Sequence, residues 1–466
     1  MTNIDYNYIQ NRLKKFNSLK EILNKNIFID WFFIPKPHPL YLGRYKVFEK
    51  NSFYILLLLI KNLFKILILF FVKIFSKKNN FSQFNEINFD YMIISHHISN
   101  NNLFENDIYY KNISKILKDK KKKYFSIYLD HQINLDQTKL KNKKNYYFLS
   151  NTLTILDELY CIIHIIKLFS FYLKIKNFSY KEKLIILTEV LNSETLVNIR
   201  INFQLKKIFK KINFKFLITT FEGYNFEKIV FDLAKKKDPR IQNIGYQHAP
   251  VLIDHYSLFD FQKTNFYPDV IFTSGNYYKK IFEKFVTTKP IFIAGSSKLN
   301  KKNFVKSNKQ NFCLVLPEGI ISECKLLFDF TINYTKKFKN LNFIWRLHPL
   351  MKIDDILKKL KINKKDLNNI YFSNNTDEDY IKSRYCLYRG STAIIGGLQN
   401  LCYPIYLNTD PSLNINPIND LQIVKNITSI NDLNSFTNNF KNDLNEIDDK
   451  ISDYFTEPTQ KFIDFL

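Results

Sequence analysis

Two short clusters in the last third of the chain combine side chains that suit a bound anion. His348-Pro349 follows the apolar run 342–347, and Gly390-Ser391-Thr392 follows the apolar run 386–388. The proline ends its strand and fixes the turn, so the histidine is presented at a strand end. A histidine there can donate to a phosphate oxygen and, when protonated, balance the charge on a leaving phosphate.

The Gly-Ser-Thr cluster offers a second set of anion-binding groups. Glycine lets the backbone approach a ligand closely. Ser391 and Thr392 precede a helical pattern, so their hydroxyls and the first free N–H groups of that helix can face an anion. Arg346 and Arg389 stand beside the two clusters, in a chain with only seven arginines. A loop histidine and a plain helix cap are the simpler alternatives, but two such clusters together favour a phosphate-bearing ligand.

An acidic residue followed by glycine occurs directly after two strand-like runs, one in each half of the chain. Glu222-Gly223 comes after the run 214–218, and a carboxylate in such a turn suits a general base that deprotonates a hydroxyl. The alternative is an acid that balances a helix dipole. Glu318-Gly319 repeats the turn after the run 312–316, where the glycine and its amides could contact a base or ribose.

Other strand ends carry residues that we expect to line the same cleft. They are His248, Gly275 and Ser296. A polar loop histidine explains His248 equally well. His96-His97 ends the first strand, and we predict a hydrogen-bonded pair there rather than a ligand site.

The order of elements indicates an α/β protein. Strand-like runs alternate with helical patterns in 81–300 and again in 308–430, which predicts two doubly wound, Rossmann-like domains that face a cleft. A lead segment, 1–80, precedes them, and a tail, 431–466, is predicted to be helical.

The composition excludes several classes of protein. The net charge is +26, mostly from lysine, which attracts anionic lipid surfaces, nucleotides and acidic sugars. Five scattered cysteines form no C-x-x-C pair, so we predict buried free thiols and no metal site. The phosphate-loop, dinucleotide-binding and nucleophile-elbow signatures are absent, and so is any basic-aromatic module typical of nucleic-acid binding.

Residues 53–75 form an apolar stretch almost long enough to span a bilayer. Lys61, Lys65 and Lys73 interrupt it, and with Asn62 they fall on one side of a helical wheel. This pattern predicts a helix that lies in the membrane interface. The alternatives are a helix packed on the domain with its lysines in water, and a true span.

Several of these segments together resemble a known group of enzymes. The segments are TTFEGYNFEK, IGYQHAP, TSGNYYKKIF, IAGSSK, LPEG, WRLHP and YRGSTAIIGG. Their order resembles that of bacterial sialyltransferases, polysialyltransferases and capsular Kdo transferases, within a surface-carbohydrate biosynthesis subgroup. The resemblance covers roughly 214–407 and implies the two-domain GT-B fold and a CMP-activated sugar donor.

The resemblance also implies roles for residues. Glu222 takes the place of the catalytic base, although Phe221 stands where the family's motif has its first acid. His348 would contact the CMP phosphate and assist its departure. The remaining donor-binding residues would be Glu318, Gly319, Arg346, Arg389, Gly390, Ser391 and Thr392. Such enzymes need no metal and no cofactor beyond the nucleotide-sugar co-substrate.

We therefore expect a cytoplasmic glycosyltransferase, peripherally associated with the inner membrane through anionic lipid. Its donor would be a CMP-linked acidic sugar such as sialic acid or Kdo, and its acceptor a glycan or glycolipid of a capsule or lipopolysaccharide. The alternatives are a GT-B enzyme that uses a UDP- or GDP-sugar, and a non-catalytic basic protein that binds nucleic acid or glycan.

Overall fold

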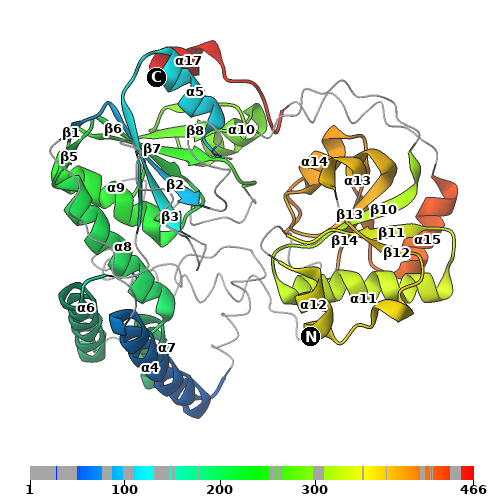
Figure 1. Cartoon of the computed structure of the whole chain (residues 1–466), viewed down its shortest axis with the longest axis horizontal. Helices are drawn as coiled ribbons and strands as arrows, with labels where there is room; N and C mark the ends of the chain where they lie inside the picture. The colour runs from blue at the N-terminus through cyan, green and yellow to red at the C-terminus, as the bar shows by residue number, and fades with distance from the viewer. Residues whose placement is uncertain are drawn as a thin grey trace.

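The computed structural model contains two α/β lobes (Figure 1). It describes residues 28, 50–75, 87–97, 107, 109–130, 146–149, 153–176, 178–251, 258–259, 264–297, 309–348, 351–373, 375–409, 415–419, 421, 423–440 and 453–466. The predicted lead segment is therefore described only at Phe28 and from residue 50 onward, and most of the predicted linker near 300 lies outside the described residues.

The N-lobe is built on a seven-stranded sheet in which every pair of neighbouring strands is parallel. In spatial order its strands are β4 (Tyr146–Phe148), β3 (Tyr124–Asp130), β2 (Tyr91–His97), β6 (Phe216–Thr220), β7 (Gln242–Gln247), β8 (Val270–Thr273) and β9 (Ile291–Ile293). The helices between them are α5 (Lys111–Asp119), α9 (Asn225–Lys237) and α10 (Asn276–Phe285). A short parallel pair, β1 (Ile87–Asn88) and β5 (Ile212–Asn213), lies beside this sheet. The inner strands β2, β6, β7 and β8 are almost fully buried, as expected when helices cover a parallel sheet on both sides, whereas the edge strands β4 and β9 are only partly buried.

The C-lobe repeats this architecture with six parallel strands. Their order is β12 (Ile370–Phe372), β11 (Asn342–Trp345), β10 (Gln310–Leu316), β13 (Ser383–Tyr388), β14 (Tyr403–Leu407) and β15 (Lys425–Ile427). The helices are α11 (Ile321–Lys337), α12 (Ile353–Leu360), α13 (Thr376–Lys382), α14 (Ile394–Gln399) and α15 (Ile430–Asn439). The predicted α/β class, with two doubly wound sheets as in GT-B proteins, is confirmed.

The end of the chain returns to the N-lobe (Figure 1). Phe462 of α17 (Gln460–Phe465) packs edge-on against Phe272, with ring centroids 4.8 Å apart. The Tyr91 hydroxyl donates to the carbonyl of Leu466 at 2.8 Å. The predicted helical tail is thus two separate pieces in the described chain, because α15 packs on the C-lobe and α17 on the N-lobe.

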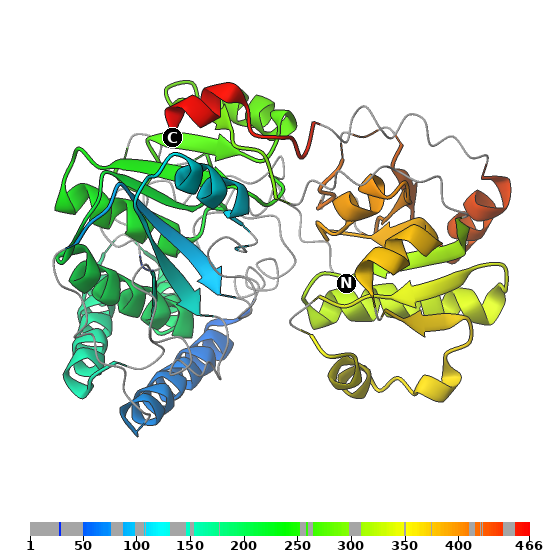
Figure 2. The ribbon, with the colours of Figure 1, turned by 45° about the horizontal axis from the view of Figure 1, so that its top comes forward.

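A group of helices extends from the N-lobe on one side (Figures 1 and 2). It contains α4 (Ser52–Phe75), α6 (Ile155–Lys174), α7 (Tyr180–Val190) and α8 (Ser193–Phe209). The predicted helix 53–75 is present as α4, and it is the one described helix long and apolar enough to cross a bilayer.

The orientation of α4 differs from the alternative of a helix packed on the domain through its apolar face, with its lysines in water. The Asn62 side chain donates to the carbonyl of Thr188 at 3.0 Å, and Lys65 Nζ lies 3.1 Å from the hydroxyl of Ser193. Ile55 and Ile66 are buried on the same side. The apolar face points away from the protein, with Phe64 60% and Ile68 61% exposed. Asn62 and Lys65 of the polar stripe contact the protein because the last turn of α7 and the start of α8 offer them hydrogen-bond partners, whereas Lys61 is exposed.

Candidate functional site

Three neighbouring strands of the N-lobe bring polar groups to one edge of the sheet. His96 lies near the end of β2, Glu222 follows β6 and His248 follows β7. The strand order reverses between β2 and β6, since β2 continues to β3 on one side and β6 to β7 on the other. Open α/β sheets bind ligands at such a switch point, outside the carboxyl ends of the strands.

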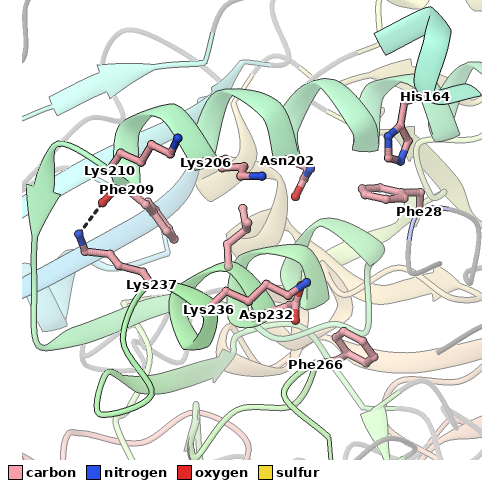
Figure 3. Close-up of a pocket in the computed structure, with 11 residues that line it drawn as sticks. Phe28, His164, Asn202, Lys206, Phe209, Lys210, Asp232, Lys236, Lys237 and Phe266 are labelled. Carbon is pink, nitrogen blue, oxygen red and sulfur yellow. Dashed lines mark hydrogen bonds and ion pairs between the residues drawn. The ribbon is translucent and has the colours of Figure 1, made fainter. Parts of the chain in front are cut away.

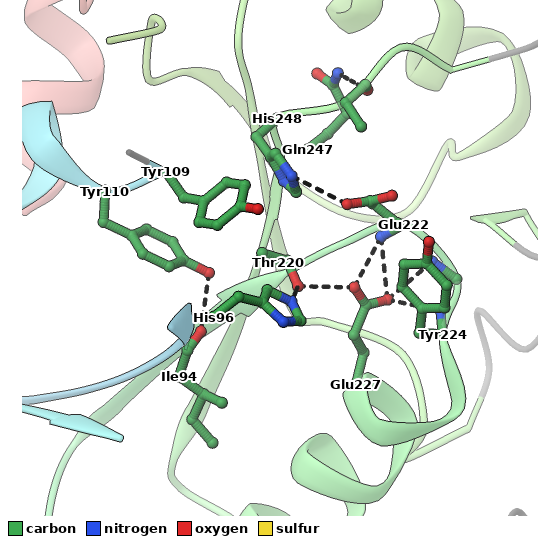
Figure 4. A network of polar contacts seen from close by, with 12 residues as sticks. Ile94, His96, Tyr109, Tyr110, Thr220, Glu222, Tyr224, Glu227, Gln247 and His248 are labelled. Atoms are coloured by element: carbon green, nitrogen blue, oxygen red, sulfur yellow. Dashed lines mark hydrogen bonds and ion pairs between the residues drawn. The ribbon is translucent and has the colours of Figure 1, made fainter. Parts of the chain in front are cut away.

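The turn that carries Glu222 is held by a second carboxylate, Glu227, at the start of α9 (Figure 4). Glu227 is buried and accepts hydrogen bonds from the backbone N–H groups of Glu222, Gly223 and Tyr224 at 2.8–3.0 Å. It also accepts a hydrogen bond from the Thr220 hydroxyl at 2.9 Å. Gly223 takes a positive φ of 79°, which glycine adopts without strain. This network fixes the backbone of the turn through Glu227 and does not use the Glu222 carboxylate, which pairs with His248.

The Glu222 carboxylate pairs with His248 (Figure 4). Glu222 Oε1 lies 3.0 Å from His248 Nε2, and the two side chains are 19% and 7% exposed. The ring of Tyr109 packs edge-on against the His248 ring at 4.4 Å. Burial and the nearby Glu222 carboxylate raise the pKa of Tyr109, so its phenol stays protonated. A carboxylate that is oriented by an imidazole and still partly accessible is an arrangement that suits general base chemistry.

The C-lobe assembles the second set of predicted residues at the matching edge of its sheet. Glu318 follows β10, His348 follows β11, and Ser391 follows β13. These three strands are neighbours in the order β11-β10-β13, and the strand order reverses between β10 and β13. The three clusters, which are far apart in the sequence, are therefore neighbours in the fold because their parallel strands end at the same edge of the sheet.

His348, Arg346, Ser391 and Thr392 line one pocket of about 330 Å³. Its wall also includes Tyr380, Gln399, Leu316 and Pro317. Phe455 also lines the pocket; it belongs to the described C-terminal residues 453–466, which return to the N-lobe and are called the returning segment below. The structure thus brings together the imidazole and the two hydroxyl residues that the sequence analysis linked to one phosphate.

Two glycines allow the parts of this site to touch. A Cβ placed on Gly319 would lie 3.1 Å from Cγ of His348. A Cβ on Gly390 would lie 1.6 Å from Oε1 of Glu318, so the Glu318 carboxylate would have to move. Gly319 thus packs closely on His348, and Gly390 lets the Glu318 carboxylate lie against the Gly-Ser-Thr turn.

The positive charge of the pocket comes from Arg346. Its guanidinium donates to the Tyr380 hydroxyl at 2.6 Å and lies over the Tyr380 ring, with Cζ 5.2 Å from the centroid. Tyr380 in turn donates to the carbonyl of Ala393 at 2.7 Å. Burial, together with the charge of Arg346, lowers the pKa of His348, while Glu318 acts in the opposite direction. The imidazole is therefore neutral near pH 7 in the unliganded pocket.

Arg389 occupies a different place from the one predicted. Its guanidinium Nη1 lies 3.2 Å from Oε1 of Glu323, and each side chain is 6% exposed. Arg389 is absent from the pocket lining. Because α11 presents a carboxylate to the inner side of this turn, the arginine pairs within the core and not with the pocket.

Gly275 and Ser296 are covered by the chain itself. A Cβ on Gly275 would lie 2.3 Å from the carbonyl oxygen of Tyr454. The N–H of Ser296 donates to the carbonyl of Thr456 at 3.1 Å, and Ser296 is buried. The prediction that these strand ends line an open cleft is wrong for both residues, because the returning segment occupies their edge of the sheet. His248, the third residue of that group, does pair with Glu222.

The structure also shows site residues that the sequence analysis missed. Tyr380 and Gln399 line the C-lobe pocket, and Tyr109 packs on His248. His96 Nε2 lies 3.5 Å from the Thr220 hydroxyl at the N-lobe switch point, although its role was predicted to be structural. A signal existed only for His96, which ends a strand; the other three lie within helices or at their starts, where no motif marks them.

Among the described residues, no group of three or more His, Cys, Asp or Glu side chains could hold a metal ion. The five cysteines are free and buried, as predicted.

Comparisons with known proteins give a fold likeness and no family. No protein-family model matches the chain, and no curated protein matches it. Among solved structures, the UDP-GlcNAc 2-epimerase of Methanocaldococcus jannaschii, in complex with UDP-GlcNAc and UDP, is similar at a TM-score of 0.47 and 12% identity, covering 76% of this chain and 93% of that one. The glycotransferase of kitacinnamycin gives 0.46 and 10%, covering 81% and 97%.

MurG of Acinetobacter baumannii gives a TM-score of 0.44 and 11% identity, covering 81% of this chain and 99% of that one. Likeness of this degree assigns neither a substrate nor a reaction to the chain.

Proposed function

We propose that this protein is a glycosyltransferase that moves a sugar from a nucleotide-sugar donor to a hydroxyl of a glycan or glycolipid. The observation that carries the proposal is the pocket in which His348, Ser391 and Thr392 meet at the switch point of the C-lobe. The Glu222–His248 pair at the switch point of the N-lobe supplies the second half of the chemistry.

The reaction follows from these two sets of groups. Glu222 takes the proton of the acceptor hydroxyl, and the acceptor oxygen attacks the anomeric carbon of the donor. The bond between that carbon and the phosphate oxygen breaks, and the nucleotide leaves with the electron pair. His348, Arg346, Ser391 and Thr392 surround the place where the negative charge grows, which is the electrostatic contribution expected of such groups.

We propose a CMP-linked acidic sugar, such as sialic acid or Kdo, as the donor. The support is the resemblance of the strand-end segments to CMP-sugar-dependent transferases, in which histidine and hydroxyl groups bind a single phosphate. The lone strong cation in the described pocket lining, Arg346, suits a nucleoside monophosphate leaving group, and no metal takes part in this scheme.

We also propose that the enzyme works at the cytoplasmic surface of the inner membrane, in the assembly of capsule or lipopolysaccharide. The support is the outward apolar face of α4 and a net charge of +26, which favours anionic lipid. Lys61 lies at the border of that face and is exposed, where a long cationic side chain can reach lipid headgroups.

The test is a donor panel followed by two substitutions. The purified protein is incubated with CMP-sialic acid, CMP-Kdo, UDP-N-acetylglucosamine and a GDP-sugar, and released nucleotide is measured. We expect CMP release, reduced by about 10²-fold or more in His348→Ala and in Glu222→Gln, because positioned acid–base groups contribute ~10²–10⁴. Release of UDP or GDP alone would show that the donor is a UDP- or GDP-sugar. Full activity in both variants would show that His348 and Glu222 are not part of the active site.

A further inference from the structure

A second cavity lies between α8 and α9 of the N-lobe (Figure 3). It has a volume of about 730 Å³, within the usual range for ligand pockets, and it shares no lining residue with the C-lobe pocket. Its walls come from α8 and α9, with Phe28, Phe266 and His164 of α6 at one end.

The α8 wall carries a polar row. Asn202, Lys206 and Lys210 are spaced by four residues and therefore share one face of the helix. Lys206 and Lys210 are exposed, and no side-chain hydrogen bond or ion pair to another described residue accompanies either Nζ. Two ammonium groups at neighbouring turns of a helix repel each other unless an anion lies between them.

The cations on the facing wall are already engaged. Lys236 pairs with Asp232 at 2.6 Å, and Lys237 donates to the carbonyl of Phe209 at 2.6 Å and so caps the end of α8. Figure 3 shows these side chains across the cavity from Lys206 and Lys210. Helix capping accounts for Lys237. Lys206 and Lys210, in the last turn and at the C-cap of α8, favour the helix dipole, but this role leaves their ammonium groups open to an anion in the cavity.

The remaining walls are apolar. Phe209 and Leu233 line the cavity, and Phe28 and Phe266 lie at the end near α6. A pocket that combines a lysine pair with phenyl walls fits a ligand that is anionic at one end and apolar at the other.

The position of α6 indicates where such a ligand comes from. His164 of α6 lines the cavity, and the turns around it expose Tyr160, Ile163 and Ile166 to the outside. This outer surface of α6 lies in the same helical group as the exposed apolar face of α4. Exposed apolar surfaces of this extent are rare on a soluble monomer and mark membrane or partner contacts.

We propose that this cavity binds the phosphate group of an anionic membrane lipid between Lys206 and Lys210, with the acyl part leaving past Phe28 and α6. The proposal rests on the membrane association proposed above and not on the transfer reaction. It adds a specific lipid site to what would otherwise be a general attraction between a basic protein and an anionic surface.

The experiment uses soluble probes, so that it does not depend on membrane association. Binding of dihexanoylphosphatidic acid below its micellar concentration is measured by isothermal titration calorimetry for the full chain. Glycerol 3-phosphate provides the same phosphate without acyl chains, and dihexanoylphosphatidylcholine provides the chains with a masked phosphate charge. We expect the phosphatidic acid to bind about tenfold or more tightly than either, since both ends of the ligand contribute.

A matched pair of variants tests the lysines. Lys206→Ala/Lys210→Ala should weaken the binding of dihexanoylphosphatidic acid by about tenfold or more, because each lysine contributes a charge-assisted hydrogen bond. The control, Lys111→Ala/Lys115→Ala, removes two exposed lysines with the same spacing from α5 and should leave the affinity within about twofold. Melting temperatures confirm that both variants fold.

Three results would overturn the proposal: no binding to the wild-type chain, equal weakening by both double variants, or glycerol 3-phosphate binding as tightly as the lipid. The last would identify a soluble phosphate compound as the ligand. None of these results affects nucleotide release by Glu222 and His348, so failure of the lipid site and failure of the proposed reaction are separable.

Discussion

His348 is neutral in the unliganded pocket because burial and the charge of Arg346 lower its pKa. A phosphate dianion or monoanion beside the ring would favour the protonated form and raise that pKa. With the proposed nucleotide bound, His348 would therefore take up a proton, and it could return that proton to the leaving phosphate.

This coupling predicts the pH dependence of nucleotide binding. Between the lowered pKa of the empty site and the raised pKa of the occupied site, binding takes up a proton, so affinity falls as pH rises through the second value. Titrations of CMP between pH 5.5 and 8.5, in buffers of different ionisation enthalpy, should show proton uptake for the wild type. His348→Gln should bind more weakly and without proton uptake; a pH-independent wild type would contradict this role.

Glu227 is the residue that holds the turn carrying Glu222. It is buried and accepts three backbone N–H groups and the Thr220 hydroxyl. Glu227→Gln replaces one acceptor oxygen with a donor that faces those N–H groups. We expect a loss of about 2–4 kcal/mol in the free energy of unfolding, since hydrogen bonds to charged groups contribute ~1.5–3 kcal/mol each and do not add fully.

Urea denaturation measures this loss, and Glu222→Gln is the matched control. The Glu222 side chain is 19% exposed and pairs with His248, so the stability of this variant should stay within about 1 kcal/mol of the wild type. Equal stability of the two variants would show that Glu227 does not hold the turn.

At the scale of elements, α4 exposes large apolar side chains, whereas a helix on the surface of a soluble protein normally packs its apolar face against the core. Asn62 and Lys65 contact α7 and α8, while the large apolar side chains face outward. Burying such a face in a bilayer removes apolar area from water at roughly 25 cal/mol per Å², so a few residues of this size suffice for stable attachment.

Charges on that face should release the protein from membranes. Phe64→Glu/Ile68→Glu places two carboxylates where the exposed fractions are 60% and 61%. Flotation with vesicles of phosphatidylcholine and phosphatidylglycerol should fall by about tenfold or more, because two bulky apolar contacts are replaced by charges that anionic lipid repels. The melting temperature should change little, as neither side chain is buried.

The control for this prediction is Phe285→Glu/Tyr371→Glu, which adds the same charges at exposed aromatic positions outside the helical group. If the control lost flotation equally, net charge alone would govern binding and α4 would have no special role.

The comparison of sequence and structure separates local from long-range information. His348, Ser391 and Thr392 could be placed together in advance, because each follows a strand and parallel strands end at one edge. Arg389 could not, since its partner Glu323 comes from a helix whose facing side no local pattern reveals.

The same limit applies to larger pieces of the chain. Gly275 and Ser296 end strands as a cleft residue would, but the segment from 453 onward covers them. The contacts of Asn62 and Lys65 of α4 likewise depend on Thr188 and Ser193, more than 120 positions away in the chain. Periodicity identifies a helix face, whereas the partner that the face meets is decided by the whole fold.

At the scale of the whole molecule, the returning segment ties the two lobes together. Tyr454 stacks on Tyr277 of the N-lobe at 4.3 Å, and Phe455 lines the C-lobe pocket. Tyr454 and Phe455 also belong to a hydrophobic cluster that contains Leu316 and Tyr388 of the C-lobe. The wall of the candidate donor site is thus anchored on the opposite lobe.

Gly275→Ala should loosen this tie. Its new Cβ would lie 2.3 Å from the Tyr454 carbonyl oxygen, so the segment must move. Overpacking of this kind costs ~1–3 kcal/mol, and limited proteolysis should cleave near residue 453 faster than in the wild type. Lys284→Ala, on the exposed side of α10, should leave the cleavage rate unchanged. A Gly275→Ala protein with wild-type protection would show that the segment is not docked there.

The central claim is that one nucleotide phosphate is held jointly by the His348 imidazole and the Ser391 and Thr392 hydroxyls. Calorimetric titration of CMP into the wild type, His348→Ala, Ser391→Ala/Thr392→Ala and the triple variant tests it most directly. We expect each change to weaken binding by about tenfold or more and the triple variant to lose less than the product of the two, because residues that share a ligand are coupled. Wild-type affinity for CMP in all three variants would contradict the account.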